Sequence, residues 1–140
     1  MIAPILAVED VDRSLAFYTK QLAFRQDFCL EGADGQSAFA FVSMGEGADR
    51  AAIGLSRQPL EGPRGQGVVF TVYIPKAMEI DRYYEAVRSR GVPLEEEIKT
   101  QYWGDRSFSL RDPDGYYLSL SQTVAETDMD HVRSVMRGES

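Results

Sequence analysis

Residues 102–122 read YWGDRSFSLRDPDGYYLSLSQ, and this stretch decides the fold. The DPDG segment at residues 112–115 is typical of a tight turn, because proline presets one turn φ and glycine tolerates a positive one. On either side of it, apolar and hydroxyl side chains alternate as they do in strands. We therefore predict a β-hairpin with two unlike faces. The apolar face holds Phe108, Leu110, Leu118 and Leu120, and the hydroxyl face holds Ser107, Ser109, Tyr117, Ser119 and Ser121.

The composition fits one compact domain. The chain has 140 residues, 44% of them hydrophobic, which is enough to build a core. Fifteen basic against 22 acidic residues give a net charge of −7, which argues against nucleic acid or an anionic membrane as a partner. Two interpretations of this acidity stay open, namely solubility and attraction of a cationic ligand. Cys29, the single cysteine, is expected to be a small buried side chain, and without a leader or long apolar run we expect a cytoplasmic protein.

The first half of the chain predicts a strand, a helix and three further strands. Residues 2–8 form an apolar run of strand length, in which Pro4 favours an edge position or a strand start. Asp10 is a suitable N-cap for a helix with an apolar stripe of Val11, Leu15, Tyr18 and Leu22. Three strands follow at residues 24–30, 37–44 and 51–56.

The second half repeats this order after a linker rich in Pro and Gly at about residues 57–67. A strand at residues 68–74, a helix at about 76–90 and a strand at 93–99 precede the hairpin. The stripe of Ile80, Tyr84 and Val87 lies 69 residues after Val11, Leu15 and Tyr18. We therefore predict an α+β fold of two βαβββ modules, at about residues 1–58 and 68–122, forming a single domain over residues 1–140. A C-terminal helix at about residues 126–137, capped by Thr127 or Asp128, is expected to pack on the domain or on a partner.

Two segments carry a resemblance to a known family. AVEDVDRSLAFYTKQLAF at residues 7–24 and WGDRSFSLRDPDGYYLSLS at residues 103–121 resemble the vicinal oxygen chelate superfamily, the fold of glyoxalase I, bleomycin-resistance proteins and extradiol dioxygenases. The chain is most similar to the bleomycin-resistance branch. The resemblance implies that the modules form a concave mixed sheet and that the protein is a homodimer, since those relatives form ligand clefts between paired subunits. One departure is Ala23, where the family commonly has glycine, and it bears on the end of the first helix.

The divalent metal of this superfamily has no credible ligands here. The resemblance places the ligand positions on Ala3, Gly54, Gly67 or Val69, and Ser119. The strands that contain these positions hold no His, Cys, Asp or Glu. The only histidine, His131, falls in the predicted C-terminal helix, so no Ser-His or Cys-His pair is indicated. We expect no metal ion, no cofactor and no catalytic residue.

Aromatic and hydroxyl side chains remain as the candidate site. They suit a flat aromatic or cationic organic ligand, held by ring stacking and a few hydrogen bonds. The candidate ligand-binding residues are Phe39, Phe41, Tyr102, Trp103, Arg106, Tyr117, Ser119 and Ser121. For Phe39 and Phe41 the pattern is equally compatible with a place in the core. Arg106 either binds a ligand carboxylate or pairs with Asp105 or Glu97 to fix its loop.

The resemblance and the candidate residues together favour metal-independent binding of a small molecule. Sequestration of an aromatic, cationic antibiotic of the bleomycin class would be such a function. Two alternatives stay open. One is a glyoxalase-like lyase or isomerase, or a dioxygenase-related enzyme, with a non-standard or absent metal site. The other is a scaffold whose cleft is filled by its own side chains or tail. The expected partners are a small organic ligand and a second copy of the chain, without nucleic acid or membrane.

Overall fold

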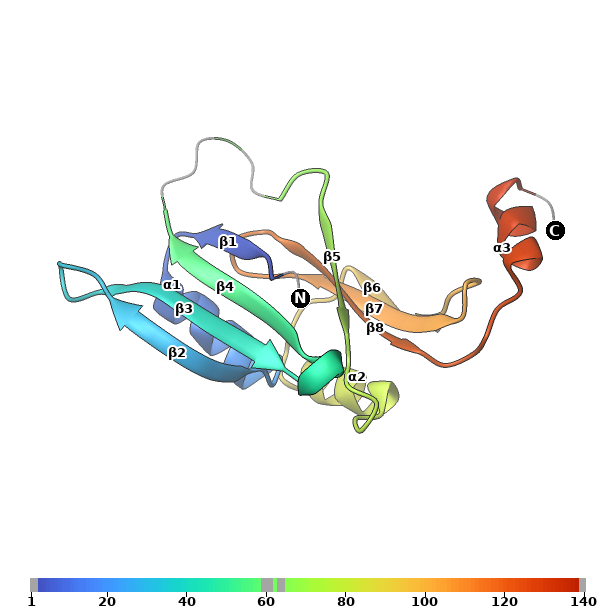
Figure 1. Ribbon diagram of the computed structural model, residues 1–140, viewed down its shortest axis with the longest axis horizontal. Helices are drawn as coiled ribbons and strands as arrows, with labels where there is room; N and C mark the ends of the chain where they lie inside the picture. The colour runs from blue at the N-terminus through green and yellow to red at the C-terminus, as the bar shows by residue number, and fades with distance from the viewer. Residues whose placement is uncertain (1–2, 59–61, 63–64, 139–140) are drawn as a thin grey trace.

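The computed structural model describes residues 3–58, 62 and 65–138, and it contains two four-stranded sheets (Figure 1). The first sheet has the order β1 (Ile5–Val8), β4 (Ala51–Arg57), β3 (Ser37–Met44) and β2 (Arg25–Glu31). The second has the order β5 (Val69–Tyr73), β8 (Tyr117–Thr123), β7 (Asp105–Arg111) and β6 (Glu96–Thr100). In each sheet the first pair is parallel and the others are antiparallel. The predicted α+β fold of two βαβββ modules is confirmed, with one sheet per module.

The first helix begins at Val11, as predicted, whereas the second and the C-terminal helices begin about one turn later than predicted. They are α1 (Val11–Ala16), the π-helical η1 (Phe17–Gln21), the short η2 (Gly47–Asp49), α2 (Ile80–Ser89) and α3 (Met129–Met136). Asp10 caps α1 as predicted, because its carboxylate accepts a hydrogen bond of 3.1 Å from the Arg13 backbone N–H. None of the helices in the described part of the chain is long and apolar enough to cross a membrane.

The π-helical turn η1 accounts for a one-residue difference in length between the helices of the two modules. Val11 at the start of α1 corresponds to Ile80 at the start of α2, 69 residues on. At the helix ends, Ala23 with φ of 62° corresponds to Gly91 with φ of 80°, only 68 residues on. A π-turn accommodates one extra residue within a helix, so η1 absorbs this difference. Ala23 thus occupies a left-handed position, which the glycine common in the family would adopt without strain.

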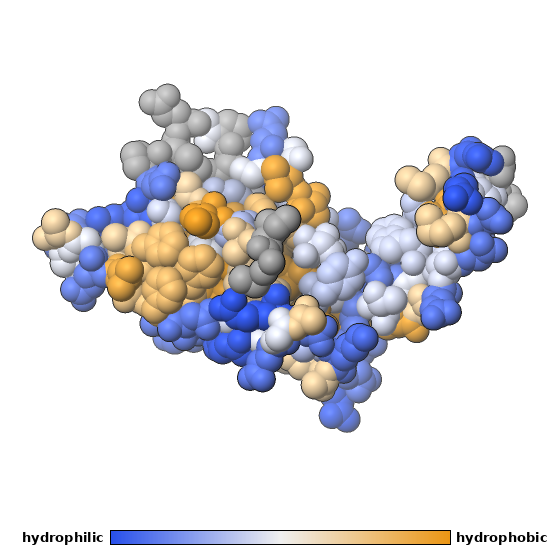
Figure 2. All heavy atoms as spheres, in the orientation of Figure 1, coloured by the Kyte–Doolittle hydropathy of each residue, from blue (hydrophilic) through white to orange (hydrophobic). Residues whose placement is uncertain are grey.

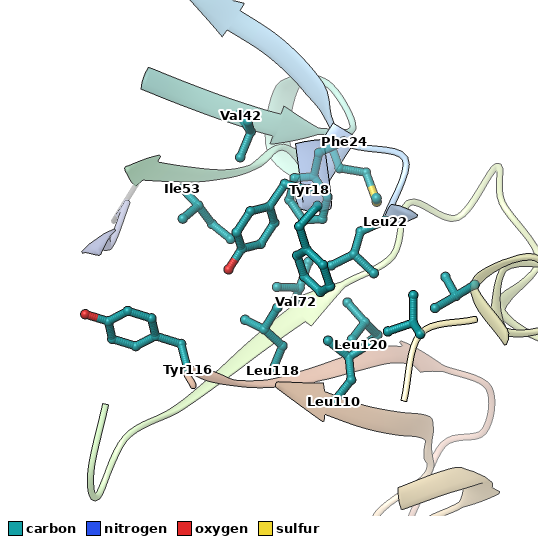
Figure 3. Close-up of a cluster of buried hydrophobic side chains, with 14 of the residues drawn as sticks. Tyr18, Leu22, Phe24, Val42, Ile53, Val72, Leu110, Tyr116, Leu118 and Leu120 are labelled. Carbon is teal, nitrogen blue, oxygen red and sulfur yellow. The ribbon is translucent and has the colours of Figure 1, made fainter. Parts of the chain in front are cut away.

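One hydrophobic core lies between the two modules. Inner-face side chains of both sheets and the helices α1, η1 and α2 form a single buried cluster. Figure 3 shows Tyr18 and Leu22 from the first module pointing toward Leu118 and Leu120 of β8. Because side chains alternate across a strand, the outer faces of the two sheets point away from each other. The side chains on each outer face are therefore not constrained by the shared core.

Hydrogen bonds from the hairpin turn join the second module to the first. The Tyr18 hydroxyl donates to the buried Asp112 carboxylate at 2.8 Å, and the Tyr116 hydroxyl donates to the Ala7 carbonyl oxygen at 2.8 Å. Burial beside Asp112 raises the pKa of Tyr18 well above its usual value, which keeps its hydroxyl a donor. The predicted turn is confirmed, with Gly115 at φ of 94°.

The C-terminal helix α3 stands away from the two sheets at the end of an extended segment (Figure 1). Asp128 caps it by accepting a hydrogen bond from the Asp130 backbone N–H at 3.0 Å, one of the two predicted caps. Val132 is its one buried residue, while Met129 and Met136 are exposed. Packing of this helix on the domain or on a partner therefore stays a prediction.

Candidate ligand-binding site

A hollow of about 740 Å³ opens on the outer face of the second sheet. This volume is typical of small-molecule sites. Residues of β5, β7, β8, β6 and two loops line it, namely Gly65, Gln66, Gly67, Val68, Val69, Thr71, Glu96, Gln101, Trp103, Ser107, Phe108, Ser109, Arg111, Tyr117 and Ser119. No residue of α3 is among them, so within the described part of the chain this helix does not fill the hollow.

Hydroxyl side chains form the floor of this hollow. In the antiparallel register of β7 and β8, Ser107 lies opposite Ser121 and Ser109 lies opposite Ser119. These serines face outward because the residues that alternate with them on both strands fill the core. Ser107, Ser109 and Ser119 therefore line the hollow from two adjacent strands, with Ser107 and Ser109 almost fully buried beneath it.

At one end of the hollow, a carboxylate and two hydroxyls form a chain of hydrogen bonds. The Tyr117 hydroxyl donates to Glu96 Oε1 at 2.9 Å and lies 2.6 Å from the Ser109 hydroxyl oxygen. Partial burial raises the pKa of Tyr117, so its hydroxyl stays protonated. This chain could hold a polar group of a ligand or move a proton between oxygens.

The cation at the same end is already paired. Arg111 Nε lies 3.0 Å from Glu95 Oε1, and the Arg111 guanidinium carbon is 5.2 Å from the centre of the Tyr117 ring. The ion pair and the cation-π contact hold this guanidinium against the protein. Arg111 thus shapes the wall of the hollow, with its charge compensated by Glu95.

At the other end, two aromatic side chains share one carboxylate oxygen. Trp103 Nε1 donates to Asp105 Oδ2 at 3.2 Å, and the Tyr73 hydroxyl donates to the same oxygen at 2.8 Å. The Tyr102 ring meets the Trp103 ring edge-on, with 4.9 Å between the ring centres. Trp103 remains 45% exposed, so its ring is fixed in position yet open to a ligand.

The predicted linker supplies one wall of the hollow. Gly65 and Gly67 have positive φ angles of 67° and 78°, and they turn the chain toward β5. A Cβ atom on Gly65 would lie only 2.7 Å from the Tyr116 ring, so this position needs glycine. Residues 59–61 and 63–64 of the predicted linker lie outside the described residues. The Pro- and Gly-rich composition predicted the connection and gave no sign of this wall.

Five of the eight candidate residues gather at or beside the hollow. Trp103, Tyr117 and Ser119 line it. Ser121 is hydrogen-bonded to Ser119 at 3.2 Å between their hydroxyl oxygens, and Tyr102 packs on Trp103.

The two phenylalanine candidates lie on the other sheet. Together with Phe28, Phe39 and Phe41 form an aromatic cluster on the outer face of the first sheet, with ring centres 5.4 to 6.1 Å apart. We call this cluster the phenylalanine face. Figure 2 shows apolar side chains gathered over β2, β3 and β4. Phe39 and Phe41 are not part of the buried core and do not line the hollow of the same chain. Their alternative place in the core is therefore wrong, and their role in ligand binding stays a prediction.

Arg106 is not part of the hollow, which corrects its place among the candidates. It lies on the opposite face of β7, where its guanidinium forms two hydrogen bonds to Asp81 Oδ1 and Oδ2 of 2.8 and 3.0 Å. This pairing lowers the pKa of Asp81. Arg106 forms an ion pair, but its partner is Asp81 on α2, so the predicted pair with Asp105 or Glu97 is wrong.

The residues present do not fit a divalent metal. The strand register places Ile5 opposite Gly54 and Thr71 opposite Ser119, so the residues beside these two ligand positions are Ile5 and Thr71 instead of Ala3 and Gly67 or Val69. None of these side chains is a usual metal ligand at such a site. Among the residues the structure describes, no three His, Cys, Asp or Glu side chains come together as a metal site.

Several residues of the hollow were not chosen from the sequence. Ser107 and Ser109 carried the same signal as Ser119, since they alternate with buried residues of the hairpin. Nothing in the sequence indicated that Thr71 and Glu96 line the hollow, because the register of their strands with the hairpin cannot be predicted from the sequence alone.

Comparison with known families gives a match along most of the chain. The model of the Glyoxalase/Bleomycin resistance protein/Dioxygenase superfamily matches residues 2–120. An uncharacterised protein of Mycobacterium bovis, Mb0911c, is 25% identical over 142 aligned positions, which cover 96% of this chain and 91% of the relative.

Solved structures show the same architecture. TioX from Micromonospora sp. ML1 superposes with a TM-score of 0.66 at 16% identity, covering 91% of this chain and 99% of that one. A glyoxalase/bleomycin resistance protein from Streptomyces sp. CB03234 superposes with a TM-score of 0.65 at 23% identity, covering 86% of this chain and 97% of that one. At these identities the likeness concerns the fold.

Proposed function

Because the chain belongs to the glyoxalase/bleomycin resistance protein/dioxygenase superfamily, we propose that it is a cytoplasmic homodimer that binds a small organic molecule without a metal ion. The ligand is flat and aromatic, or cationic, and an antibiotic of the bleomycin class has both properties. The proposal depends above all on the open hollow over the second sheet. It combines a hydroxyl floor with the Trp103 ring and has no set of metal ligands.

The phenylalanine face supports the homodimer. Phe28 is 43% exposed on it, and the neighbouring Leu30 and Ile5 are 56% and 58% exposed. Such a patch is costly to leave in water. If the first sheet of one copy covers the second sheet of the other, a twofold axis repeats the contact and closes two identical hollows. Each site would then have a hydroxyl floor from one subunit and an aromatic wall from its partner.

Titration of the chelator-treated protein with copper-free bleomycin tests the proposal. Trp103 is the only tryptophan, so its fluorescence reports on the hollow. We expect saturable quenching that is unchanged by added nickel or zinc. A matched Trp103→Phe variant, followed by calorimetry, should bind more weakly because the larger ring is lost. No heat and no quenching with bleomycin, together with a stoichiometric response to either metal, would contradict the proposal.

A second candidate function draws on the hydrogen-bonded chain of Glu96, Tyr117 and Ser109. A carboxylate, a phenol and a serine hydroxyl in line could serve a lyase or isomerase of the glyoxalase type that works without the usual metal. Turnover of the hemithioacetal of methylglyoxal and glutathione by the chelator-treated protein, abolished by Glu96→Gln, would favour this candidate. Absence of turnover with and without added nickel or zinc would leave ligand binding as the function.

A further inference from the structure

The carboxylate of Asp105 is buried on the outer face of the second sheet without a cationic partner. The residue is 6% exposed. Its oxygens accept hydrogen bonds from the Tyr73 hydroxyl at 2.8 Å, from Trp103 Nε1 at 3.2 Å and from the Thr123 hydroxyl at 2.8 Å. All three donors are neutral. They satisfy the hydrogen-bonding needs of the carboxylate but leave its negative charge uncompensated.

The two cations described on this face, Arg111 and Lys99, form no ion pair with Asp105. Among the described residues, no Lys, Arg or His forms an ion pair with Asp105. Arg111 is paired with Glu95 at the far end of the hollow. Lys99 lies in register with Ser107 on the edge strand β6, where its side chain is exposed. A buried charge without a partner attracts a cation more strongly than an exposed one, since water screens it less.

Two ring faces accompany this charge. Trp103 is 45% exposed and Tyr73 is 52% exposed, and both are anchored to Asp105 Oδ2. Anchoring fixes the rings beside the carboxylate, so a cation placed over either ring is attracted by both the ring and the charge. The hydrogen bond to Asp105 raises the pKa of Tyr73, which keeps this tyrosine neutral.

We propose that Asp105, Trp103 and Tyr73 form a subsite for an organic cation at the Trp103 end of the hollow. The inference rests on the proposed binding function and specifies the part of the ligand that binds here. The cation is a quaternary ammonium or an N-alkylated aromatic ring, because two aromatic faces and one carboxylate suit a large, weakly hydrated charge. The uncharged remainder of the ligand extends over the serines of the floor.

Two probes of nearly equal shape distinguish the effect of the ligand's positive charge from that of its aromatic ring. At pH 8, 10-methylacridinium is a permanent cation, whereas 9-methylacridine is neutral. We expect the wild-type protein to bind both and to bind the cation more tightly, roughly tenfold. The fluorescence anisotropy of each probe measures its affinity without using Trp103 as the reporter.

Asp105→Asn removes the charge and preserves the hydrogen bonds. The amide oxygen can accept from Trp103 and Tyr73, and the amide nitrogen can donate to the Thr123 hydroxyl, which also accepts. The variant should lose roughly tenfold in affinity for 10-methylacridinium and stay within about twofold for 9-methylacridine. Glu85→Gln is the matched control, because it removes the same charge from an exposed position on α2. It should leave both affinities unchanged.

The outcomes distinguish the subsite from the function on which it rests. Equal losses for both probes in Asp105→Asn would mean that Asp105 only positions Trp103, which overturns the cation subsite and leaves the binding function intact. Unchanged affinities in Asp105→Asn would overturn the subsite in the same way. If neither probe binds the wild-type protein and bleomycin does not bind either, the proposed function fails and the subsite fails with it.

Discussion

The outer faces of the two sheets have the same register and opposite chemistry. Across the first sheet, β1, β4, β3 and β2 place Ile5, Gly54, Phe41 and Phe28 in one row. Across the second sheet, β5, β8, β7 and β6 place Thr71, Ser119, Ser109 and Glu96 in the corresponding row. One row is apolar and the other carries three hydroxyls and a carboxylate.

The inner faces do not differ in this way. On β4 the inward residues are Ile53 and Leu55, and on β8 they are Leu118 and Leu120, all almost fully buried. The shared core favours apolar residues at the centre of both inner faces, because a polar group there would lose its water without a partner. The outer sides are free of that constraint, so the difference between them points to function instead of folding.

The largest expected effect comes from adjacent residues on the two faces of β7. Phe108→Ala should lower the free energy of unfolding by about 3 to 5 kcal/mol, because it leaves a cavity in the core. Ser109→Ala should lower it by about 1 kcal/mol, through loss of the hydrogen bond with Tyr117. Urea unfolding followed by circular dichroism measures both. Similar losses for the two variants would contradict the division into a structural inner face and a functional outer face.

A second prediction turns the apolar row into a copy of the polar one. Phe28→Glu with Phe41→Ser gives the first sheet the residues found at the corresponding places in the second. We expect the proposed dimer to weaken by roughly a hundredfold, because two large apolar side chains leave the contact. Sedimentation velocity over a range of concentrations measures the change.

The control for this double variant lies on α2, which packs against the second sheet. Arg88→Glu also introduces an acidic side chain at an exposed position, and this position is outside the phenylalanine face. It should leave sedimentation of the dimer unchanged. A dimer that survives in Phe28→Glu with Phe41→Ser would show that the phenylalanine face is not the contact between copies.

Much of the fold could be predicted because the signals are local. The spacing of Val11, Leu15 and Tyr18 defines a helix, and the DPDG turn fixes the register of the two strands that it joins. The family glycine missing at Ala23 correctly pointed to the helix end, where the φ angle is positive. Each of these features depends on residues within a few positions of one another.

The candidate site was harder to predict because it depends on how distant elements meet. Alternation showed that Phe41 and Ser119 each face one side of a strand, but not that the two sheets join by their inner faces and separate these residues. The partner of Arg106 was not predicted for the same reason, since Asp81 lies on a helix 25 residues earlier in the chain. The surroundings of Asp105 could not be predicted either, because its hydrogen-bond partner Tyr73 lies on β5, 32 residues earlier in the chain.

A smaller effect on stability is expected at the helix end of the first module, where Ala23 stands at the position that Gly91 occupies in the second. Ala23→Gly should raise the free energy of unfolding by about 0.5 to 1 kcal/mol, because Ala23 holds a φ of 62° that glycine adopts without strain. Ala86→Gly in the middle of α2 should lower it by about 1 kcal/mol. Urea unfolding of both variants is the measurement. A loss of stability in both would mean that the left-handed position in the first module carries no strain.

The smallest expected effect on stability comes from Asp112. This residue lies in the hairpin turn of the second module and is buried against the first module. Burial raises the pKa of Asp112 above its usual 3.8, while hydrogen bonds from Tyr18 and the turn oppose this shift. The native state therefore holds the proton more tightly than the unfolded chain does. The contribution of Asp112 to stability is greatest below pH 3.8 and is lost as pH rises through the raised native pKa.

Asp112→Asn should remove this dependence on pH, so the wild-type protein should gain stability relative to the variant as pH falls toward 3.8. Asp81→Asn is the matched comparison of opposite sign. Pairing with Arg106 lowers the pKa of Asp81, so its contribution is present above pH 3.8 and is lost as pH falls through the lowered native pKa. Urea unfolding of the three proteins between pH 3 and 7 measures both differences. The stability difference between wild type and Asp112→Asn should change with pH in the opposite direction to that between wild type and Asp81→Asn. If both change in the same direction, burial does not set the pKa of Asp112, and the carboxyl is solvated like an exposed one.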